Sequence, residues 1–301
     1  MDLFYAQGRV ERVGAWNIWV RDTKGTRKPL LLLHGFPTSS FDWSRMWQSL
    51  EAEFRLVAFD MLGFGHSDKP IGHSYTIMEQ ADIALVIMSR VAIAPETTTI
   101  LAHDYGDSVA QELMARATFL HVFLLNGGML PEAHRPLCVQ NVVADRTVGQ
   151  LLCFGLCRPV FGIIMRRLFA RVTRAELDDF WKLVSRENGH VNIHSLLGYM
   201  QERRRHRNRW IEPLSRPNVS ILIGTADPVS GDVWNYRKLN VAEVTCGHYP
   251  HWESPDAVIS WIQNTVRDDR RLKNVCQKAH RDDPSYAARR ETASVESNEL
   301  P

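Results

Sequence analysis

The 301-residue sequence has almost no net charge and no long apolar run. Lysine and arginine number 36 against 34 aspartate and glutamate residues, a formal net charge of +2. No overall field therefore exists to recruit nucleic acid or an acidic partner. The most apolar segment, Leu151–Met165, is interrupted by Arg158 and Pro159 and is shorter than the roughly 20 residues that a membrane-spanning helix needs. We expect it to form a pair of helices that is buried or lies at an interface.

Secretion signals and metal motifs are also missing. Residues 1–8 include Asp2 and hold no apolar stretch of signal-peptide length, so we expect no secretion. The five cysteines form an odd set without a C-x-x-C pair, which is a poor framework for disulfides or zinc and favours a reducing compartment. His190 and His194 share the spacing of one helix face but have no evident third ligand. We predict no metal and no other cofactor.

The sequence does contain an alternation of apolar strands and helices. With 45% hydrophobic and 23% charged residues the composition is that of a globular protein. The alternation predicts an α/β fold with a doubly wound, mostly parallel sheet. We assign residues 1–130 and 211–266 to this core and residues 131–210, which have no strand pattern, to an inserted helical cap over the crevice where such sheets bind ligands. Residues 267–301 are polar and charged and are expected to be disordered. The predicted strands include Leu30–Leu33, Phe54–Phe59, Thr97–Ala102, Val219–Ile223 and Val241–Thr245.

The strongest chemical signal follows the strand Thr97–Ala102. The sequence Ala102-His103-Asp104-Tyr105-Gly106 places small residues on both sides of an aspartate, the pattern of a sharp turn that holds a nucleophile between a strand and a helix. A carboxylate at a helix N-terminus stays ionised and can attack carbon without a base. We predict Asp104 as the nucleophile, with a plain helix cap as the alternative role. A serine pattern centred on Ser108 begins too far into the helix.

Two later strands end in residues that can assist Asp104. Asp227 follows one of them and His248 follows the last, which gives the chain order nucleophile, aspartate, histidine. We expect His248 to activate water and Asp227 to orient the imidazole. His251 is the rival histidine, but it lies at the start of the next predicted helix.

The turn His34-Gly35-Phe36-Pro37 ends the third predicted strand. In folds of this kind the loop at that position supplies one backbone donor to a developing oxyanion, and the residue after the nucleophile supplies the other. We therefore predict the backbone N–H groups of Phe36 and Tyr105 as the oxyanion hole.

Together these motifs resemble the epoxide hydrolase and haloalkane dehalogenase branch of the α/β-hydrolase superfamily. The resemblance covers about residues 10–265 and rests on four motifs. It implies a hydrolase that forms a covalent ester on its aspartate, acts on a small apolar substrate and needs no cofactor. The motifs are His34-Gly35-Phe36-Pro37, Asp60-x-x-Gly63-x-Gly65-x-Ser67-Asp68, His103-Asp104-Tyr105-Gly106 and Gly247-His248-Tyr249-Pro250.

The residues that would hold the leaving group separate the two activities. Haloalkane dehalogenases of this branch bind halide with a tryptophan after the nucleophile and an asparagine or similar donor after the first His-Gly, whereas this chain has Tyr105 and Phe36 there. Epoxide hydrolases use cap tyrosines, and Tyr199 is the single tyrosine between Pro131 and Trp210. An epoxide hydrolase-like enzyme with Tyr199 as acid is thus expected, with helix packing as the alternative role of Tyr199.

Two further alternatives concern partners and location. A catalytically idle scaffold or membrane-associated binding protein is the alternative of another class. The run Arg203–Arg209 is interpreted as a solvated helix face rather than a lipid contact. We expect a cytoplasmic protein without a nucleic-acid partner. Association with the endoplasmic reticulum membrane, through the cap, is the other location considered.

Overall fold

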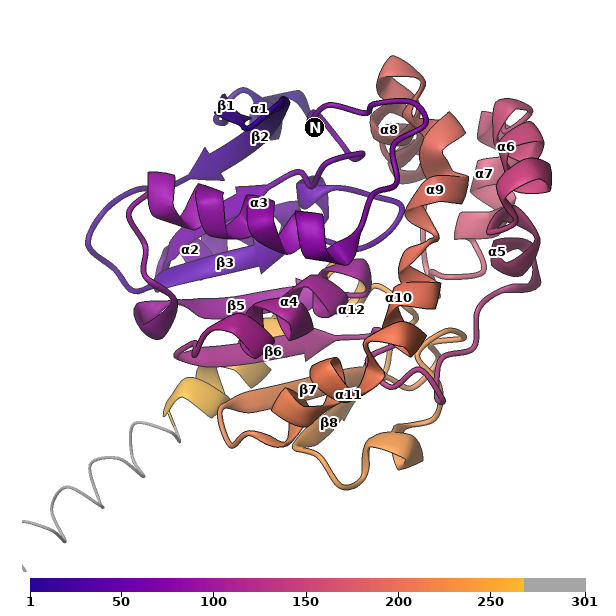
Figure 1. Cartoon of the computed structure of the whole chain (residues 1–301). Coiled ribbons are helices and arrows are strands. Elements are labelled where there is room, and N and C mark those ends of the chain that lie inside the picture. The colour runs from indigo at the N-terminus through magenta and orange to yellow at the C-terminus, as the bar shows by residue number, and fades with distance from the viewer. Residues whose placement is uncertain (268–301) are drawn as a thin grey trace, which may run out of the picture. The chain divides into compact units, whose positions relative to one another are not determined.

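The computed structural model describes residues 1–267, of which residues 1–256 form one compact unit. The unit is built on an eight-stranded sheet of order β1-β2-β4-β3-β5-β6-β7-β8 (Figure 1). The pairs β1–β2 and β2–β4 are antiparallel and all other pairs are parallel. The predicted fold class is confirmed. The strands are β1 (Arg9–Val13), β2 (Trp16–Asp22), β3 (Pro29–Leu33), β4 (Arg55–Phe59), β5 (Thr99–His103), β6 (His121–Leu125), β7 (Val219–Gly224) and β8 (Val241–Val244).

The central strands are apolar on both faces because helices cover both sides of the sheet. All four leucines of β3 are fully buried, and every residue of β5 and β6 is buried. Such strands are continuous aliphatic runs rather than alternating ones. Strand β5 begins at Thr99, two residues later than predicted, because Pro95–Thr97 forms a 3₁₀ turn.

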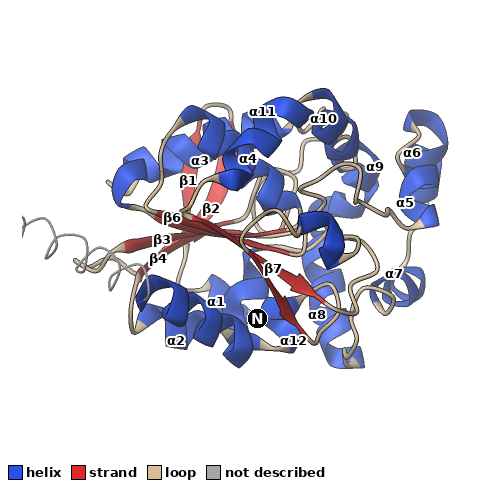
Figure 2. Ribbon diagram, turned by 90° about the horizontal axis from the view of Figure 1, so that it is seen from below, coloured by secondary structure: helices blue, strands red, loops and turns tan. Residues whose placement is uncertain are grey.

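The helices of the core divide between the two faces of the sheet (Figure 2). α3 and α4 pack on one face, and α1, α2 and α12 lie on the other. The side chain of Thr76 accepts a hydrogen bond from the Glu79 N–H group and so begins α3. These helices are α1 (Asp2–Tyr5), α2 (Trp47–Glu51), α3 (Ile77–Arg90), α4 (Tyr105–Arg116) and α12 (Pro250–Glu253).

The chain between β6 and β7 is helical throughout its regular structure and lies at the carboxyl ends of the parallel strands (Figure 1). This segment corresponds to the predicted cap, residues 131–210. Its helices are α5 (Cys138–Val143), α6 (Arg146–Phe154), α7 (Arg158–Met165), α8 (Arg174–Ser185), α9 (Ile193–Leu196), α10 (Tyr199–Arg205) and α11 (Arg207–Ile211). Of the second unit the structure describes residues 257–267, which are helical. The predicted disordered tail lies outside the described residues from residue 268 onward.

A buried carboxylate joins the end of the cap to the core. Glu112 of α4 is 1% exposed and accepts hydrogen bonds from Arg116 (2.6 Å), from Arg209 (2.8 and 3.0 Å) and from the indole N–H of Trp210 (2.7 Å). Burial raises the pKa of Glu112, but the bonds from Arg209, Trp210 and Arg116 outweigh it and lower the pKa to about 2. Glu112 is therefore ionised and fully paired at neutral pH, which fixes α11 against α4.

Candidate active site

Asp104 lies at a strained turn between β5 and α4. Its backbone has φ 48° and ψ −102°, a conformation that non-glycine residues rarely adopt. Gly106, two residues after Asp104, has no room for a side chain, because a Cβ atom there would lie 2.3 Å from the carbonyl oxygen of Leu33. The sharp turn predicted from the sequence is present, and Asp104 stands at its apex. Ser108 lies inside α4, where its hydroxyl accepts a hydrogen bond from Arg203 (2.7 Å).

The loops after β7 and β8 bring Asp227 and His248 to Asp104. Nδ1 of His248 lies 3.0 Å from both carboxylate oxygens of Asp227, and Nε2 lies 4.0 Å from Oδ2 of Asp104. All three side chains are buried. Burial lowers the pKa of His248, but the negative charge of Asp227 and its hydrogen bond outweigh this effect and raise the pKa above its ordinary value. The second ring nitrogen of His248, Nε2, therefore faces Asp104.

One of the two predicted oxyanion donors already contacts Asp104. The N–H group of Phe36 donates to Oδ2 of Asp104 at 3.2 Å. Tyr105 is the first residue of α4 and follows Asp104 directly, so its N–H group belongs to the free N-terminus of that helix. Of the two predicted donors, the Phe36 N–H group thus contacts the Asp104 carboxylate, and the Tyr105 N–H group follows Asp104 directly along the chain.

Tyr199 is the cap residue that lies over this turn. It begins α10 and is fully buried, with its ring 5.2 Å from the ring of Tyr105 and 6.1 Å from that of Phe36. Its hydroxyl oxygen makes no hydrogen bond within the described residues. Burial, and then the negative charge of Asp104, raise the pKa of Tyr199, which keeps the phenol protonated at neutral pH. A protonated, unpaired donor near the carboxylate can bind an oxygen atom of a substrate.

Arg203, one helical turn after Tyr199, is a site residue that the sequence reasoning missed. Its side chain is 2% exposed; Nη2 donates to the backbone oxygen of Asp104 at 2.8 Å and lies 3.5 Å from Oδ1. Burial raises the pKa of Asp104, but the charges of His248 and Arg203 outweigh it, so the carboxyl is held ionised. The interpretation of Arg203–Arg209 as a solvated face is thus wrong for Arg203. The spacing of four from Tyr199, which places both on one helix face, was the available signal.

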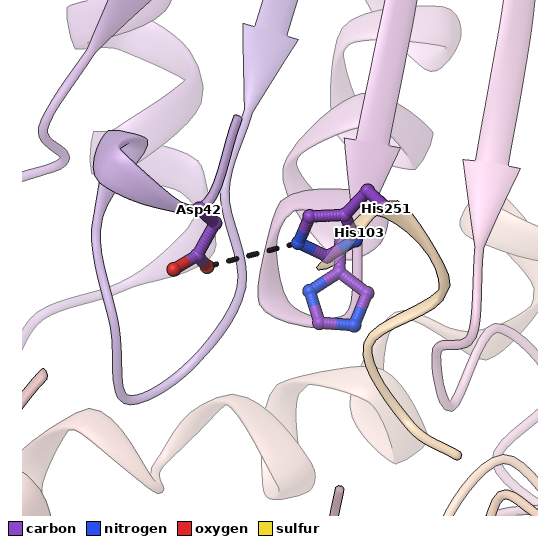
Figure 3. Close-up of side chains that lie close together, drawn as sticks. All are labelled: Asp42, His103 and His251. Atoms are coloured by element: carbon purple, nitrogen blue, oxygen red, sulfur yellow. Dashed lines mark ion pairs between the residues drawn. The ribbon is translucent and has the colours of Figure 1, made fainter. Parts of the chain in front are cut away.

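Asp42, His103 and His251 form a second group of buried polar side chains that lie close together (Figure 3). Asp42, His103 and His251 have potential ligand atoms within 4.8 Å of one another, and His251 lies in α12, as its predicted helical position required. Nε2 of His251 lies 4.0 Å from Oδ2 of Asp42, which is too long for a direct hydrogen bond. Nε2 of His103 instead bonds the backbone oxygen of His248 at 2.8 Å. Burial lowers the pKa of His103 to about 3, so that ring is a neutral donor.

An apolar cavity of about 380 Å³ lies between the cap helices and the turn that carries Phe36. Its walls come from α5, α6, α7 and α9, and its inner end is Phe36 and Pro37. Asp104 is not part of the lining, but the Phe36 N–H group at the inner end bonds its carboxylate. An apolar molecule in this cavity would therefore end beside Phe36, whose N–H group bonds Asp104. Representative lining residues are Leu137, Leu152, Leu156, Ile164 and Leu197.

The sheet, the strained turn at Asp104 and the adjoining Asp227 and His248 are the arrangement of an α/β-hydrolase. Residues 30–261 match the model of the alpha/beta hydrolase family, and the chain belongs to this family. By fold and family it is a hydrolase.

Particular relatives agree with the branch that the motifs indicated. The mesoderm-specific transcript protein of Mus musculus is 37% identical over 261 residues, which are 77% of this chain and 76% of the relative. The soluble epoxide hydrolase of Corynebacterium sp. (strain C12) is 33% identical over 89 residues, 29% of this chain and 30% of that protein. The haloalkane dehalogenase DbeA from Bradyrhizobium elkani USDA94 superposes with a TM-score of 0.73 at 17% identity over 87% of this chain and 99% of that one, a likeness of fold. The predicted resemblance is confirmed.

Proposed function

We propose that the protein hydrolyses epoxides through a covalent ester on Asp104. One oxygen of the Asp104 carboxylate attacks an epoxide carbon, the ring C–O bond breaks, and the departing oxygen takes the proton of the Tyr199 hydroxyl. Water then attacks the carbonyl carbon of the ester while His248 accepts its proton. The tetrahedral intermediate collapses to free Asp104 and a diol, and the proton on His248 returns to the tyrosinate.

The observation that carries this proposal is the pairing of Asp104 with a protonated phenol above it and an oriented imidazole 4.0 Å away. The separation is too long for a direct hydrogen bond. An imidazole at this distance suits activation of water toward an ester better than deprotonation of a nucleophile. Asp104 needs no deprotonation, because its pKa is already lowered.

The N–H groups of Phe36 and Tyr105 would stabilise the oxyanion of the second step. Phe36 N–H lies 3.2 Å from the oxygen that would become this oxyanion. Such donors contribute roughly 2.7–4 kcal/mol each in other enzymes. Arg203 adds a positive charge 3.5 Å from the other carboxylate oxygen. Its guanidinium keeps Asp104 ionised before the attack.

The test is to label the nucleophile. A single turnover of a terminal epoxide in heavy-oxygen water should place the heavy isotope in the Asp104 carboxylate, detected by mass spectrometry of its peptide. In His248→Gln the ester should persist and add the mass of the epoxide to the same peptide. Label that enters the diol alone, with an unlabelled Asp104, would exclude the covalent route.

Dehalogenation is the competing reaction. The fold likeness to a haloalkane dehalogenase makes alkyl halides necessary controls. We expect no halide release, since Phe36 and Tyr105 present no side-chain N–H donors to a halide. Release of halide at a rate equal to epoxide opening would reverse the assignment. If Asp104→Ala and the wild type were equally inert toward epoxides, halides and esters, the idle scaffold would be the better description.

A further inference from the structure

The outer helices of the cap expose apolar side chains to an unusual degree. Seven of the twelve large apolar side chains that are well exposed in the described residues lie between Val142 and Ile163. Leu151 (71%), Phe154 (66%) and Ile163 (63%) are the most exposed of the seven. Helices α6 and α7 lie at the edge of the cap that faces away from the sheet (Figures 1 and 2). A concentration of exposed apolar side chains like this one on a folded chain marks an interaction surface.

The charged residues of α6, of α7 and of the segment up to Arg174 are all arginines; the acidic residues beside them are Asp145, which caps α6, and Asp178 of α8, which pairs with Arg158. The 29 residues Arg146–Arg174 contain six arginines and no aspartate, glutamate or lysine. Arg166, Arg167, Arg171 and Arg174 are exposed at and after the end of α7. Within the described residues Arg158 is paired with Asp178, while Arg166, Arg167 and Arg171 form no ion pair. Apolar side chains bordered by unpaired arginines are complementary to an anionic phospholipid surface.

The same helices form the wall of the apolar cavity. Leu151, Leu152 and Val160 are each exposed on the surface and also line the cavity. At its inner end the cavity reaches Phe36, whose N–H group bonds Asp104. The exposed patch and the nucleophile are thus joined by apolar side chains. A substrate dissolved in lipid could pass between them without entering water.

We propose that α6, α7 and the arginines that follow form a docking surface for an anionic phospholipid bilayer, and that the cavity receives a long-chain lipophilic substrate from it. In residues 1–267 no single helix has the length and apolarity to cross a bilayer; α6 and α7 meet that standard only as a pair bent by 114°. The bend suits helices that lie in the interface with arginines at the headgroups. The docking surface is independent of the proposed function; only the statement that the reactive group of the substrate is an epoxide rests on it.

Vesicle binding tests the surface without any catalysis. The full chain is floated with vesicles of phosphatidylcholine alone or mixed with an equal amount of phosphatidylserine. We expect binding to the mixed vesicles that weakens with salt. Arg167→Gln with Arg171→Gln should reduce it about 30-fold, from roughly fivefold for each arginine. Arg27→Gln with Lys28→Gln, an exposed pair just before β3 at the opposite end of the sheet, should leave it unchanged.

An apolar pair provides the second arm. Phe154 and Ile163 are exposed but do not line the cavity. Phe154→Ser with Ile163→Ser should lower binding by more than about 100-fold. Leu3→Ser with Val10→Ser removes side chains of similar exposure in α1 and β1 and should not lower it. Equal binding by all variants, or no binding by the wild type, would overturn the proposal. It would also be overturned if the wild type formed dimers that only the Phe154→Ser, Ile163→Ser double variant failed to form, because the patch would then be a contact between two copies of the chain.

Substrate delivery separates this proposal from the proposed function. The wild type should open a terminal epoxide of a hexadecyl chain held in mixed vesicles, and Phe154→Ser with Ile163→Ser should lose most of that rate while keeping its rate on water-soluble glycidol. Equal loss on both substrates would refute delivery from the bilayer. Asp104→Ala should bind vesicles like the wild type. A wild type that binds vesicles but opens neither epoxide would refute the epoxide chemistry and leave the docking surface standing.

Discussion

Replacing Tyr199 by phenylalanine should lower activity and raise stability at once. The substitution keeps the ring, which packs on Tyr105 and lies 4.4 Å from the guanidinium carbon of Arg203. It removes a hydroxyl that is buried and has no hydrogen-bond partner within the described residues. Burying such a group costs about 1–3 kcal/mol, so the free energy of unfolding should rise by about that amount. Loss of the donor to the departing oxygen should cost roughly 2.7–4 kcal/mol, or about 100- to 1,000-fold in rate.

Two assays measure these opposite effects. Urea denaturation gives the free energy of unfolding, and initial rates on a terminal epoxide give kcat/KM. Tyr236→Phe is the matched control, because this tyrosine is equally buried but its hydroxyl donates to the backbone oxygens of Ser230 (2.9 Å) and Gly127 (3.2 Å). It should lose about 1 kcal/mol of stability and keep its activity. A Tyr199→Phe variant that is less stable than the wild type would show that the hydroxyl has a structural role, and one that is as active would show that it does not protonate the departing oxygen.

Three further predictions concern the base, the cap and the turn. His248 must be neutral to accept a proton, so the rate should fall as the pH drops through the raised pKa of this residue. Asp227→Asn should move this acid limb of the pH–rate profile to lower pH and reduce kcat by about 10,000-fold. Glu112→Gln should lower the free energy of unfolding by about 3 kcal/mol, since the pKa of Glu112 is lowered from 4.5 to about 2. This stabilisation is complete above about pH 4.5 and disappears as the pH falls toward 2. Urea unfolding curves of the variant and the wild type should therefore converge in acid, and curves that stay apart would contradict the prediction. Gly106→Ala should unfold more readily and lose activity, whereas Gly162→Ala in α7, with no atom closer than 3.8 Å to the new Cβ, should keep or raise its melting temperature.

The features that could be predicted from the sequence are those set by neighbours along the chain. The turn at Asp104 follows from the small residues around it, since only these fit a strained bend between a strand and a helix. The buried strands follow from their continuous aliphatic composition, as in β3. Asp227 and His248 were predicted to lie beside Asp104 because each comes directly after such a strand, and parallel strands bring their carboxyl ends to one edge of the sheet.

The roles that needed the tertiary structure belong to residues whose environment is supplied by distant parts of the chain. Arg203 stands in a run of arginines that resembles a solvated face, and only the packing of α10 over the turn carries it to Asp104, 99 positions earlier. Glu112 became a buried anchor because α11 brings it two donors from the far end of the cap. The apolar segment 151–165 could equally be core or surface by composition, and the fold divides it, burying Cys153, Phe161 and Met165 and leaving Leu151 and Phe154 uncovered. Local spacing encodes turns and strands, whereas charge pairing and exposure depend on which elements finally lie side by side.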